Sequence, residues 1–326
     1  MPCRDAAASI DEALASIEAQ TFTDFEVIVI DDGSLDPTPE RIDRWSARDR
    51  RIRAIRTERN GIVAALRCAS SHAAGEFIAR MDADDIAHPL RFALQLELFA
   101  ETPAIEACGT RVRYFPRDRV RDGARRYENW INSLIEPADL VRDLFVECPI
   151  AHPSLMIRSE SFEAVGGYVD RGWPEDYDLF FRLWSDGRTM AKTREVLLQW
   201  RERPERLSRT DPRYDPAAFR RCKTFYLRHH LLAGRGVVVW GAGPVGKAFA
   251  RQLLADGVSV DAFVDLDPRK IGQTVHGAPV IAPASLDAFP DRFVVGAVGS
   301  ARGRAEIRAA LRARGRAEMC DFCAVA

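Results

Sequence analysis

The chain has 326 residues, 47% of them hydrophobic and 29% charged, with a formal net charge of −1 at pH 7. This composition excludes a disordered chain, a collagen-like repeat and a small disulfide scaffold, and the near-neutral charge argues against a nucleic-acid-binding protein. At about 150 residues per domain, the length predicts about two domains.

The first hundred residues alternate between helical and strand patterns, which predicts an α/β domain with a mostly parallel sheet. Ligands bind at the carboxyl ends of the strands in such sheets. Two acidic clusters fall at predicted strand ends, Asp31–Asp32 and Asp82–Asp85. The expected helices cover 7–20, 38–48, 62–72 and the residues after Pro89, and the expected strands cover 25–34, 52–57 and 75–85.

The later segments predict a charged loop, a proline-containing connector and a second α/β unit. Residues 116–129 are densely charged and predict a mobile surface loop, the alternative being a loop that orders over substrate or touches anionic lipid. Residues 204–216 carry three prolines and predict a connector before a helix near 216–232. After Gly234 a strand, a glycine turn and a helix open a second, smaller α/β unit.

The first candidate site is MDADD, residues 81–85. Asp82 and Asp84 flank Ala83 at a strand end, and Mg²⁺ or Mn²⁺ prefers such carboxylate oxygens together with substrate phosphates. A structural alternative is a helix cap, in which Asp85 or His88 precedes the helix that Pro89 opens.

The second candidate is WPEDYDLFFRLW, residues 173–184, where acidic residues begin a helix. The helix dipole favours acids in a first turn and accounts for Asp178 without any function. A carboxylate beside Trp173 and Pro174 would also be partly desolvated, which suits a general base.

Several motifs in one order carry a family resemblance. They are MPCRDAAASIDEALASIEAQTFTDFEVIVIDDGS, RNGIVAAL, GEFIARMDADDIAHPLR, HPSLMIR, FEAVGGY and PEDYDLFFRLW. Residues 1–205 thereby resemble the inverting glycosyltransferases of family 2, which have the GT-A fold. The resemblance implies transfer of a sugar, with inversion, from a nucleoside diphosphate donor (a UDP-sugar before others) to a saccharide, lipid-linked or protein-linked acceptor.

The resemblance also assigns residues. It implies a nucleotide-sugar site of Pro2, Arg4, Asp5, Asp32, Asn60, Gly61, Arg80 and Asp82, and a Mg²⁺ or Mn²⁺ site of Asp82 and Asp84. Arg4 followed by Asp5 departs mildly from the family pattern at this loop. Asp176 matches the catalytic base, and His152, Trp173 and Glu175 are expected on the acceptor side. For His152 a hydrogen-bonded position in the core is an equal alternative.

The family has a buried central strand before the loop that contains Met1, and this sequence lacks it. Neighbouring strands would then have unpaired backbone groups, which are costly when buried. The fold expected is therefore a GT-A domain without its first strand (1–205), a helical linker (206–233) and a small Rossmann-like domain (234–326). We also expect that the true start lies several residues upstream or that the sequence is truncated.

In the small domain, GAGPVG places Gly241, Gly243 and Gly246 in a dinucleotide-binding fingerprint, and Asp265 ends the next predicted strand. This is a candidate second nucleotide site, with NAD(P) as one ligand. The alternative is an appendage whose glycines only permit tight packing. An oxidoreductase or epimerase centred here is the main competing function, followed by a sugar-phosphate nucleotidyltransferase and a non-catalytic binding protein.

Cysteine usage and hydropathy bear on location. The seven cysteines are mostly isolated and favour a reducing compartment, and the lone Cys320–Cys323 pair does not suggest a metal site. No segment approaches the ~20 apolar residues of a membrane span. Charged residues interrupt the N-terminus, unlike a signal peptide. We expect a cytoplasmic protein that at most contacts a membrane surface.

Overall fold

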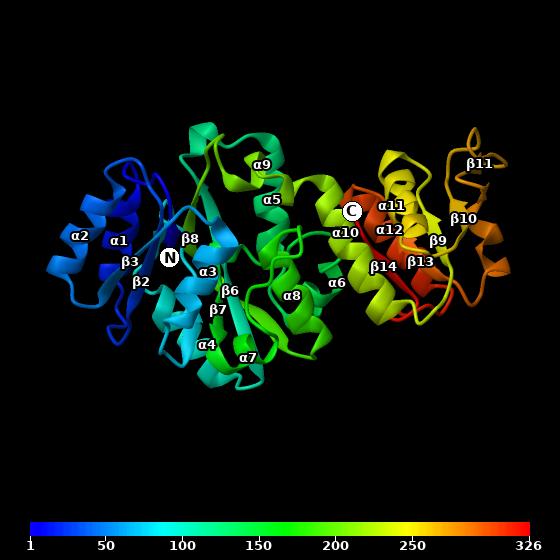
Figure 1. Cartoon of the computed structure of the whole chain (residues 1–326). Helices are drawn as coiled ribbons and strands as arrows, with labels where there is room; N and C mark the ends of the chain where they lie inside the picture. The colour runs from blue at the N-terminus through cyan, green and yellow to red at the C-terminus, as the bar shows by residue number, and fades with distance from the viewer. The chain divides into compact units, whose positions relative to one another are not determined.

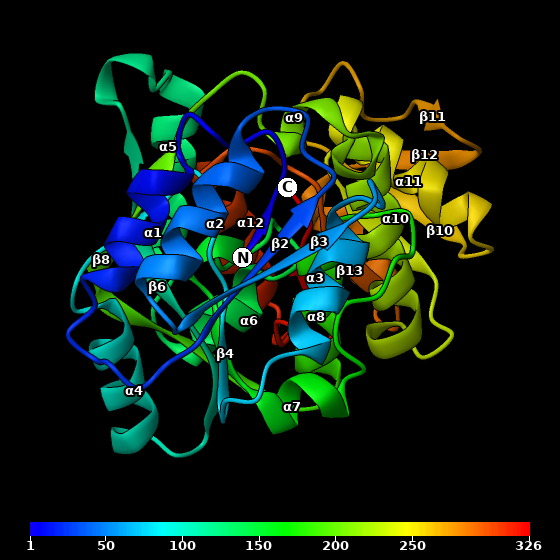
Figure 2. The ribbon, with the colours of Figure 1, turned by 60° about the vertical axis from the view of Figure 1, so that its left-hand side comes forward.

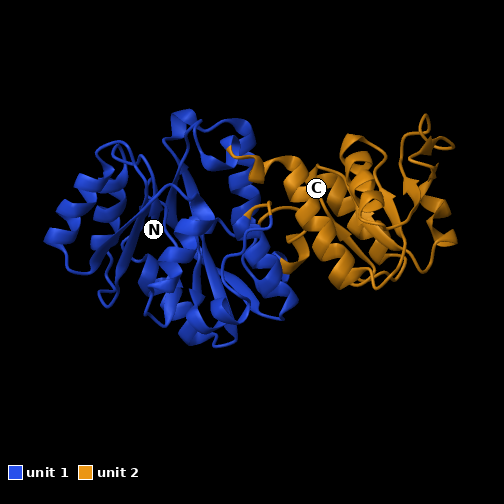
Figure 3. Ribbon diagram, viewed as in Figure 1, with its two compact units in different colours: residues 1–140, 149–171, 175–210 blue, residues 141–148, 172–174, 211–326 orange.

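The computed structural model describes residues 1–326, and the chain forms two compact units (Figure 3). Unit 1 contains residues 1–140, 149–171 and 175–210, and unit 2 contains residues 141–148, 172–174 and 211–326. Residues 211–233, expected as part of a linker, belong to unit 2. Helix α10 (Pro216–Tyr226) buries Cys222 and Tyr226 and packs on α11 (Pro244–Ala255), so this segment is part of a core.

Unit 1 begins with a parallel three-stranded sheet in the order β1-β2-β3, of which β2 and β3 are labelled in Figures 1 and 2. Its strands are β1 (Pro2–Cys3), β2 (Val27–Asp32) and β3 (Ile52–Thr57), and its helices are α1 (Ile10–Glu18), α2 (Thr38–Arg48) and α3 (Ile62–Ser71). Every residue of β2 is buried because α1 and α2 cover the face of Val29 while α3 covers the face of Ile28 and Ile30. A continuous Val/Ile run is typical of such a strand.

The second sheet of unit 1 has the order β4-β7-β6-β8-β5. Its strands are β4 (Phe77–Ala79), β7 (Met156–Arg158), β6 (Ile105–Phe115), β8 (Thr189–Arg201) and β5 (Ile86–Ala87). Only β6 and β8 pair in parallel. The expected mostly parallel sheet therefore describes the first sheet, whereas this one is mainly antiparallel. The helices of this part of the chain include α4 (Arg91–Glu101), α7 (Ser159–Ala164) and α8 (Glu175–Ser185).

The charged segment 116–129 is not the loop that its composition predicted. It forms a short 3-10 turn (Arg117–Arg119) and most of helix α5 (Asp122–Ser133), with α6 (Pro137–Asp143) following. Glu128 and Ile131 face inward, and Glu128 accepts hydrogen bonds from the Tyr114 backbone N–H (2.6 Å) and from Arg117 (2.8 Å). The arginines on the outer face obscured an amphipathic helix.

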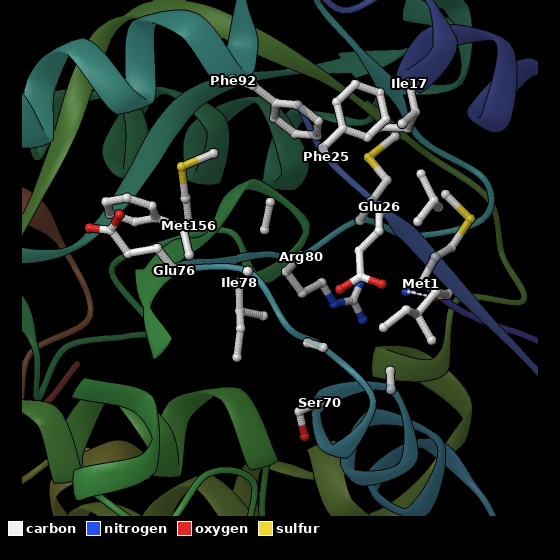
Figure 4. Close-up of a pocket in the computed structure, with 18 of the residues that line it drawn as sticks. Met1, Ile17, Phe25, Glu26, Ser70, Glu76, Ile78, Arg80, Phe92 and Met156 are labelled. Carbon is white, nitrogen blue, oxygen red and sulfur yellow. Dashed lines mark hydrogen bonds between the residues drawn. The ribbon is translucent and has the colours of Figure 1, made fainter. Parts of the chain in front are cut away.

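The two sheets of unit 1 do not join. On its outer side β2 pairs with β1 only at Ile30 and Asp31, and β4 pairs only with β7. A cavity of about 710 Å³ lies between β2 and β4 and is lined by Ile28 and Ile78 among other apolar side chains (Figure 4). No strand of the chain therefore lies between β2 and β4.

The start of the chain enters this cavity. The Met1 ammonium group donates to the Ile28 carbonyl (2.8 Å), and burial, with the charge of Arg80, lowers its pKa to about 5. Figure 4 shows Arg80 and Glu26 pointing into the cavity among the side chains of Phe25, Phe92 and others. The amine is therefore neutral at pH 7 in these mostly apolar surroundings.

Unit 2 has a six-stranded sheet in the order β11-β12-β10-β9-β13-β14, parallel except for β11. Its strands are β9 (Val237–Trp240), β10 (Val260–Val264), β11 (Thr274–Val275), β12 (Ala278–Ile281), β13 (Phe293–Gly296) and β14 (Phe322–Ala324). Helix α12 (Ala301–Arg312) buries Ile307 and Leu311 against the sheet. The strand order reverses at β9, where doubly wound folds bind ligands. None of the helices in either unit is long and apolar enough to cross a membrane.

Candidate active site

Asp32, the last residue of β2, fixes the turn at residues 60–61. Its Oδ1 accepts from the Asn60 backbone N–H (2.8 Å), and its Oδ2 accepts from that of Gly61 (3.0 Å). The Arg4 guanidinium lies 3.7 Å from the same carboxylate. Four residues predicted for the nucleotide site, Arg4, Asp32, Asn60 and Gly61, thus lie together at the carboxyl end of β2.

Strand β1 begins with Pro2, and the loop that follows this strand lies against the turn after β2. Asp5 Oδ1 accepts from the Leu35 backbone N–H (2.8 Å), and the Asp5 N–H donates to Ser34 Oγ (2.9 Å). Gly33 has a φ of +68°, and a Cβ there would lie 2.9 Å from the Arg59 nitrogen. Only glycine allows this close approach of the turn after β2 to the backbone at Arg59, which follows β3.

Asp82, Asp84 and Asp85 form an acidic cluster, with one carboxylate oxygen of each within 4.8 Å of the others. Asp82 pairs with Arg80, and Asp84 Oδ2 lies 2.9 Å from Arg203 Nη2. Asp85 Oδ1 accepts from the Arg201 backbone N–H (2.7 Å), while its buried Oδ2 has no hydrogen-bond partner.

The electrostatics of this cluster suit a divalent cation. Burial, together with Asp82 and Asp84, raises the pKa of Asp85 well above its usual value, and burial and Asp82 raise that of Asp84. A hard cation would offset this repulsion and give the orphaned Asp85 oxygen a partner. The residues present therefore fit Mg²⁺ or Mn²⁺.

The helix-cap alternative for Asp85 is wrong. Helix α4 begins at Arg91, and the Leu90 backbone N–H donates to His88 Nδ1 (3.2 Å), whereas Asp85 turns toward β8. The sequence analysis placed Asp85 in the acidic cluster but did not propose it as a metal ligand. It missed Arg201, the last residue of β8, and Arg203, which follows that strand.

Arg80, His152 and Tyr168 form a buried group beside the cluster. His152 Nε2 lies 2.7 Å from Tyr168 Oη, and its Nδ1 lies 3.9 Å from Glu175 Oε1. Burial, then the charge of Arg80, lowers the pKa of His152 well below its usual value, so the ring is neutral. His152 is thus both hydrogen-bonded in the core and in contact with Glu175. Tyr168, from the motif FEAVGGY, had no role in the sequence analysis.

Asp176 lies in the first turn of α8, where its Oδ1 accepts from the Tyr177 backbone N–H (2.7 Å). Tyr168 lies within electrostatic range of Asp176 and of Asp82, which ties this helix to the acidic cluster. Asp178 is fully buried and accepts from Arg182 (2.7 Å), a structural ion pair. Trp173 belongs to unit 2, where its ring centroid lies 5.5 Å from that of Phe225.

In unit 2 the three glycines of the GAGPVG motif differ in how closely other atoms pack against them. A Cβ at Gly246 would lie 1.8 Å from the Gly241 carbonyl oxygen, and one at Gly241 would lie 2.8 Å from that of Ala297. At Gly243 a Cβ would meet nothing within 4 Å. Asp265 Oδ2 accepts from the Ala242 backbone N–H and from Lys270 Nζ (both 2.9 Å). Packing therefore explains two glycines and leaves Gly243 unexplained.

Comparison with known proteins points to one family. A family model described as glycosyl transferase family 2 matches residues 1–166. The putative glycosyltransferase EpsE of Bacillus subtilis is 30% identical over 199 residues, which cover 60% of this chain and 68% of EpsE. The O-antigen biosynthesis glycosyltransferase WbnJ of Escherichia coli is 26% identical over 227 residues, which cover 68% of this chain and 84% of WbnJ.

A solved structure shares the fold. The crystal structure of residues 1–349 of S. aureus TarS matches with a TM-score of 0.55 at 16% identity, covering 70% of this chain. The match spans 64% of the TarS chain, a little under two thirds. Residues 211–326 lie beyond the range that the family model matches.

Proposed function

The chain belongs to glycosyl transferase family 2, and on that basis we propose that it transfers a sugar, with inversion, from a nucleoside diphosphate donor to an acceptor hydroxyl. The observation that supports this most is the cluster of Asp82, Asp84 and Asp85, with its buried, unpartnered carboxylate oxygen. Tyr168 lies within electrostatic range of both Asp82 and Asp176. This proximity supports our assignment of a metal ligand set and a candidate base to one site.

We assign the donor to the carboxyl end of β2 and to the cluster. Asp32, Asn60 and Gly61, with Arg4 and the loop from Pro2 to Asp5, would hold the nucleoside. Asp82 and Asp84 would hold the Mg²⁺ or Mn²⁺ ion, with Asp85 completing the set. When bound, the ion stabilises the negative charge of the leaving diphosphate.

We assign the acceptor to the side of α8. Asp176 would accept the proton of the acceptor hydroxyl while its oxygen attacks the anomeric carbon from the face opposite the diphosphate. Inversion needs this one base and no covalent sugar–enzyme intermediate. His152 is neutral and buried, so its role would be to hold Tyr168 and Glu175 in place. Trp173 remains a proposed acceptor contact.

The substrate class follows from the relatives by analogy. One is named an O-antigen biosynthesis glycosyltransferase and another an amylovoran biosynthesis glycosyltransferase, which supports a surface polysaccharide as the product. TarS has been solved in complex with UDP-GlcNAc, so UDP-sugars are the first donors to test.

A thermal-shift titration tests the donor. UDP, GDP, dTDP, NAD and NADP are added with and without Mn²⁺, because a ligand that binds only the folded protein raises its melting temperature. We expect one nucleoside diphosphate to raise it only when Mn²⁺ is present. A metal-independent rise with NAD or NADP alone would favour the competing oxidoreductase in unit 2.

A transfer assay then tests the base. Asp176→Asn should abolish transfer and leave the metal-dependent thermal shift intact, since the amide cannot accept a proton at neutral pH. Asp186→Asn is the control, because Asp186 lies on the surface beyond the end of α8 and pairs with Arg188. Retained turnover in Asp176→Asn would remove this residue as the base.

A further inference from the structure

Arg203 reaches the acidic cluster from the far end of β8. Its Nη2 lies 2.9 Å from Asp84 Oδ2, and its Nε is buried without a hydrogen-bond partner. The pairing of β5 with β8, Ile86 opposite Gln199, brings the residues after Arg201 next to Asp84 and Asp85. The sheet register therefore sets the contact between Arg203 and Asp84. The contact leaves the Nε–H group of Arg203 without a hydrogen-bond acceptor.

The carboxylate that Arg203 contacts is also a candidate metal ligand. Arg203 is the guanidinium that pairs with Asp84, whose charge Arg206 and Arg80 also offset. Arg80 pairs with Asp82. A divalent cation held by Asp82, Asp84 and Asp85 would repel a guanidinium at this distance. Arg203 and the metal ion would thus compete for the carboxylate of Asp84.

The segment that carries Arg203 is free of apolar anchors. Residues 203–210, which include α9 (Leu207–Thr210), are exposed or half-buried, and Leu207 is 36% exposed. Ion pairs hold the segment instead, from Glu202 to Arg206 (3.6 Å) and to Arg209, together with the stacking of Arg206 over the Trp200 ring (4.3 Å to the centroid). Segments with few buried apolar contacts open at low free-energy cost.

We propose that Arg203 is a positioning residue that neutralises Asp84 before the metal binds and then turns to the donor diphosphate. This inference rests on the proposed function. The guanidinium has donors in a fork that matches phosphate oxygens, and one of them, Nε, has no partner in the present arrangement. Arg203 therefore opposes the metal ion when it is alone and supports the nucleotide once the ion is bound.

The test measures two affinities in Arg203→Gln and in wild-type protein. Mn²⁺ binding without nucleotide is followed by electron paramagnetic resonance of the free ion, and UDP binding at saturating Mn²⁺ by calorimetry. We expect the variant to bind Mn²⁺ about tenfold more tightly, because a competing positive charge is removed. We expect it to bind UDP about tenfold or more weakly, because a charged phosphate contact is lost.

Arg194→Gln is the matched control, since Arg194 is exposed on unit 1 and pairs with Glu136. It should change neither affinity, and Arg203→Lys should give intermediate values. If Arg203→Gln leaves both affinities unchanged or weakens both, Arg203 is only a structural ion pair and the inference is wrong. If wild-type protein binds neither Mn²⁺ nor UDP, the proposed function itself fails, and the inference falls with it.

Discussion

Replacing Asp85 by asparagine should stabilise the metal-free protein. Asp85 is 1% exposed, its Oδ1 accepts from Arg201 N–H, and its Oδ2 is buried without a partner. Asparagine keeps an oxygen for the Arg201 N–H and offers an amide N–H₂ to the neighbouring carboxylates of Asp82 and Asp84. The substitution therefore removes a buried charge and an unsatisfied acceptor at once.

The magnitude follows from the cost of that acceptor. A buried polar group left unsatisfied costs about 1–3 kcal/mol. For a folded unit of roughly 200 residues, each kcal/mol moves the melting temperature by about 2–4 °C. Asp85→Asn should thus melt about 2–12 °C above wild type in EDTA. Because the pKa of Asp85 is raised, its carboxyl favours the folded state at low pH and this contribution is lost as the pH rises. The advantage of the variant should therefore grow with pH.

Differential scanning calorimetry with EDTA and then with excess Mn²⁺ is the assay. Wild type should gain stability with the ion, by about 2.7 kcal/mol at a hundred times the dissociation constant, and the variant should gain less. Asp43→Asn is the control, because Asp43 is 57% exposed and pairs only with Arg56 at the surface. A variant that melts below wild type in EDTA would refute the account of a strained acidic cluster.

Three further predictions address other parts of the chain. Gly246→Ala should destabilise unit 2 by about 3 kcal/mol or more, because its Cβ would meet the Gly241 carbonyl. Gly243→Ala should change the free energy of unfolding by less than about 0.5 kcal/mol, and denaturant titration of both variants measures the difference. In wild type the folded His152 ring stays neutral while the unfolded one takes a proton, so the free energy of unfolding falls below pH 6.5. His152→Gln should reduce this fall by up to about 1.4 kcal/mol per pH unit, as urea melts at pH 5 and 7 will show. Fusing a five-residue Val/Ile-rich strand ahead of Met1 should raise the melting temperature, and the same extension with a central proline should not.

The elements that the sequence predicted share local signals. The Val/Ile run of β2 and the helical spacing in α1 depend only on neighbouring residues, and both lie within a few residues of the expected place. The helix α5 was missed because arginines on its exposed face hide the inward positions of Glu128 and Ile131. The long strands β6 and β8 were not predicted, since their pairing joins residues about eighty positions apart and is interrupted by register shifts.

The candidate site divides in the same way. Asp82 and Asp84 could be found because two carboxylates stand together after one strand. For Asp85 a helix cap stayed open as an alternative, because its partner Arg201 comes from β8 and the local pattern does not show it. Arg203 was missed for the same reason. Tyr168 could have been noticed, since it ends a motif already singled out, but its contact with His152 depends on the tertiary fold.

The separation of the two sheets in unit 1 has a consequence for how this protein behaves in concentrated solution. Along the cavity between β2 and β4, the edge of β4 pairs with no strand, and the edge of β2 before Ile30 is paired only where the Ile28 carbonyl accepts from Met1. Unpaired strand edges are templates onto which another extended chain can add. During purification, molecules of this chain should therefore associate edge to edge as concentration rises, and short β-forming peptides should suppress that association by capping the same edges.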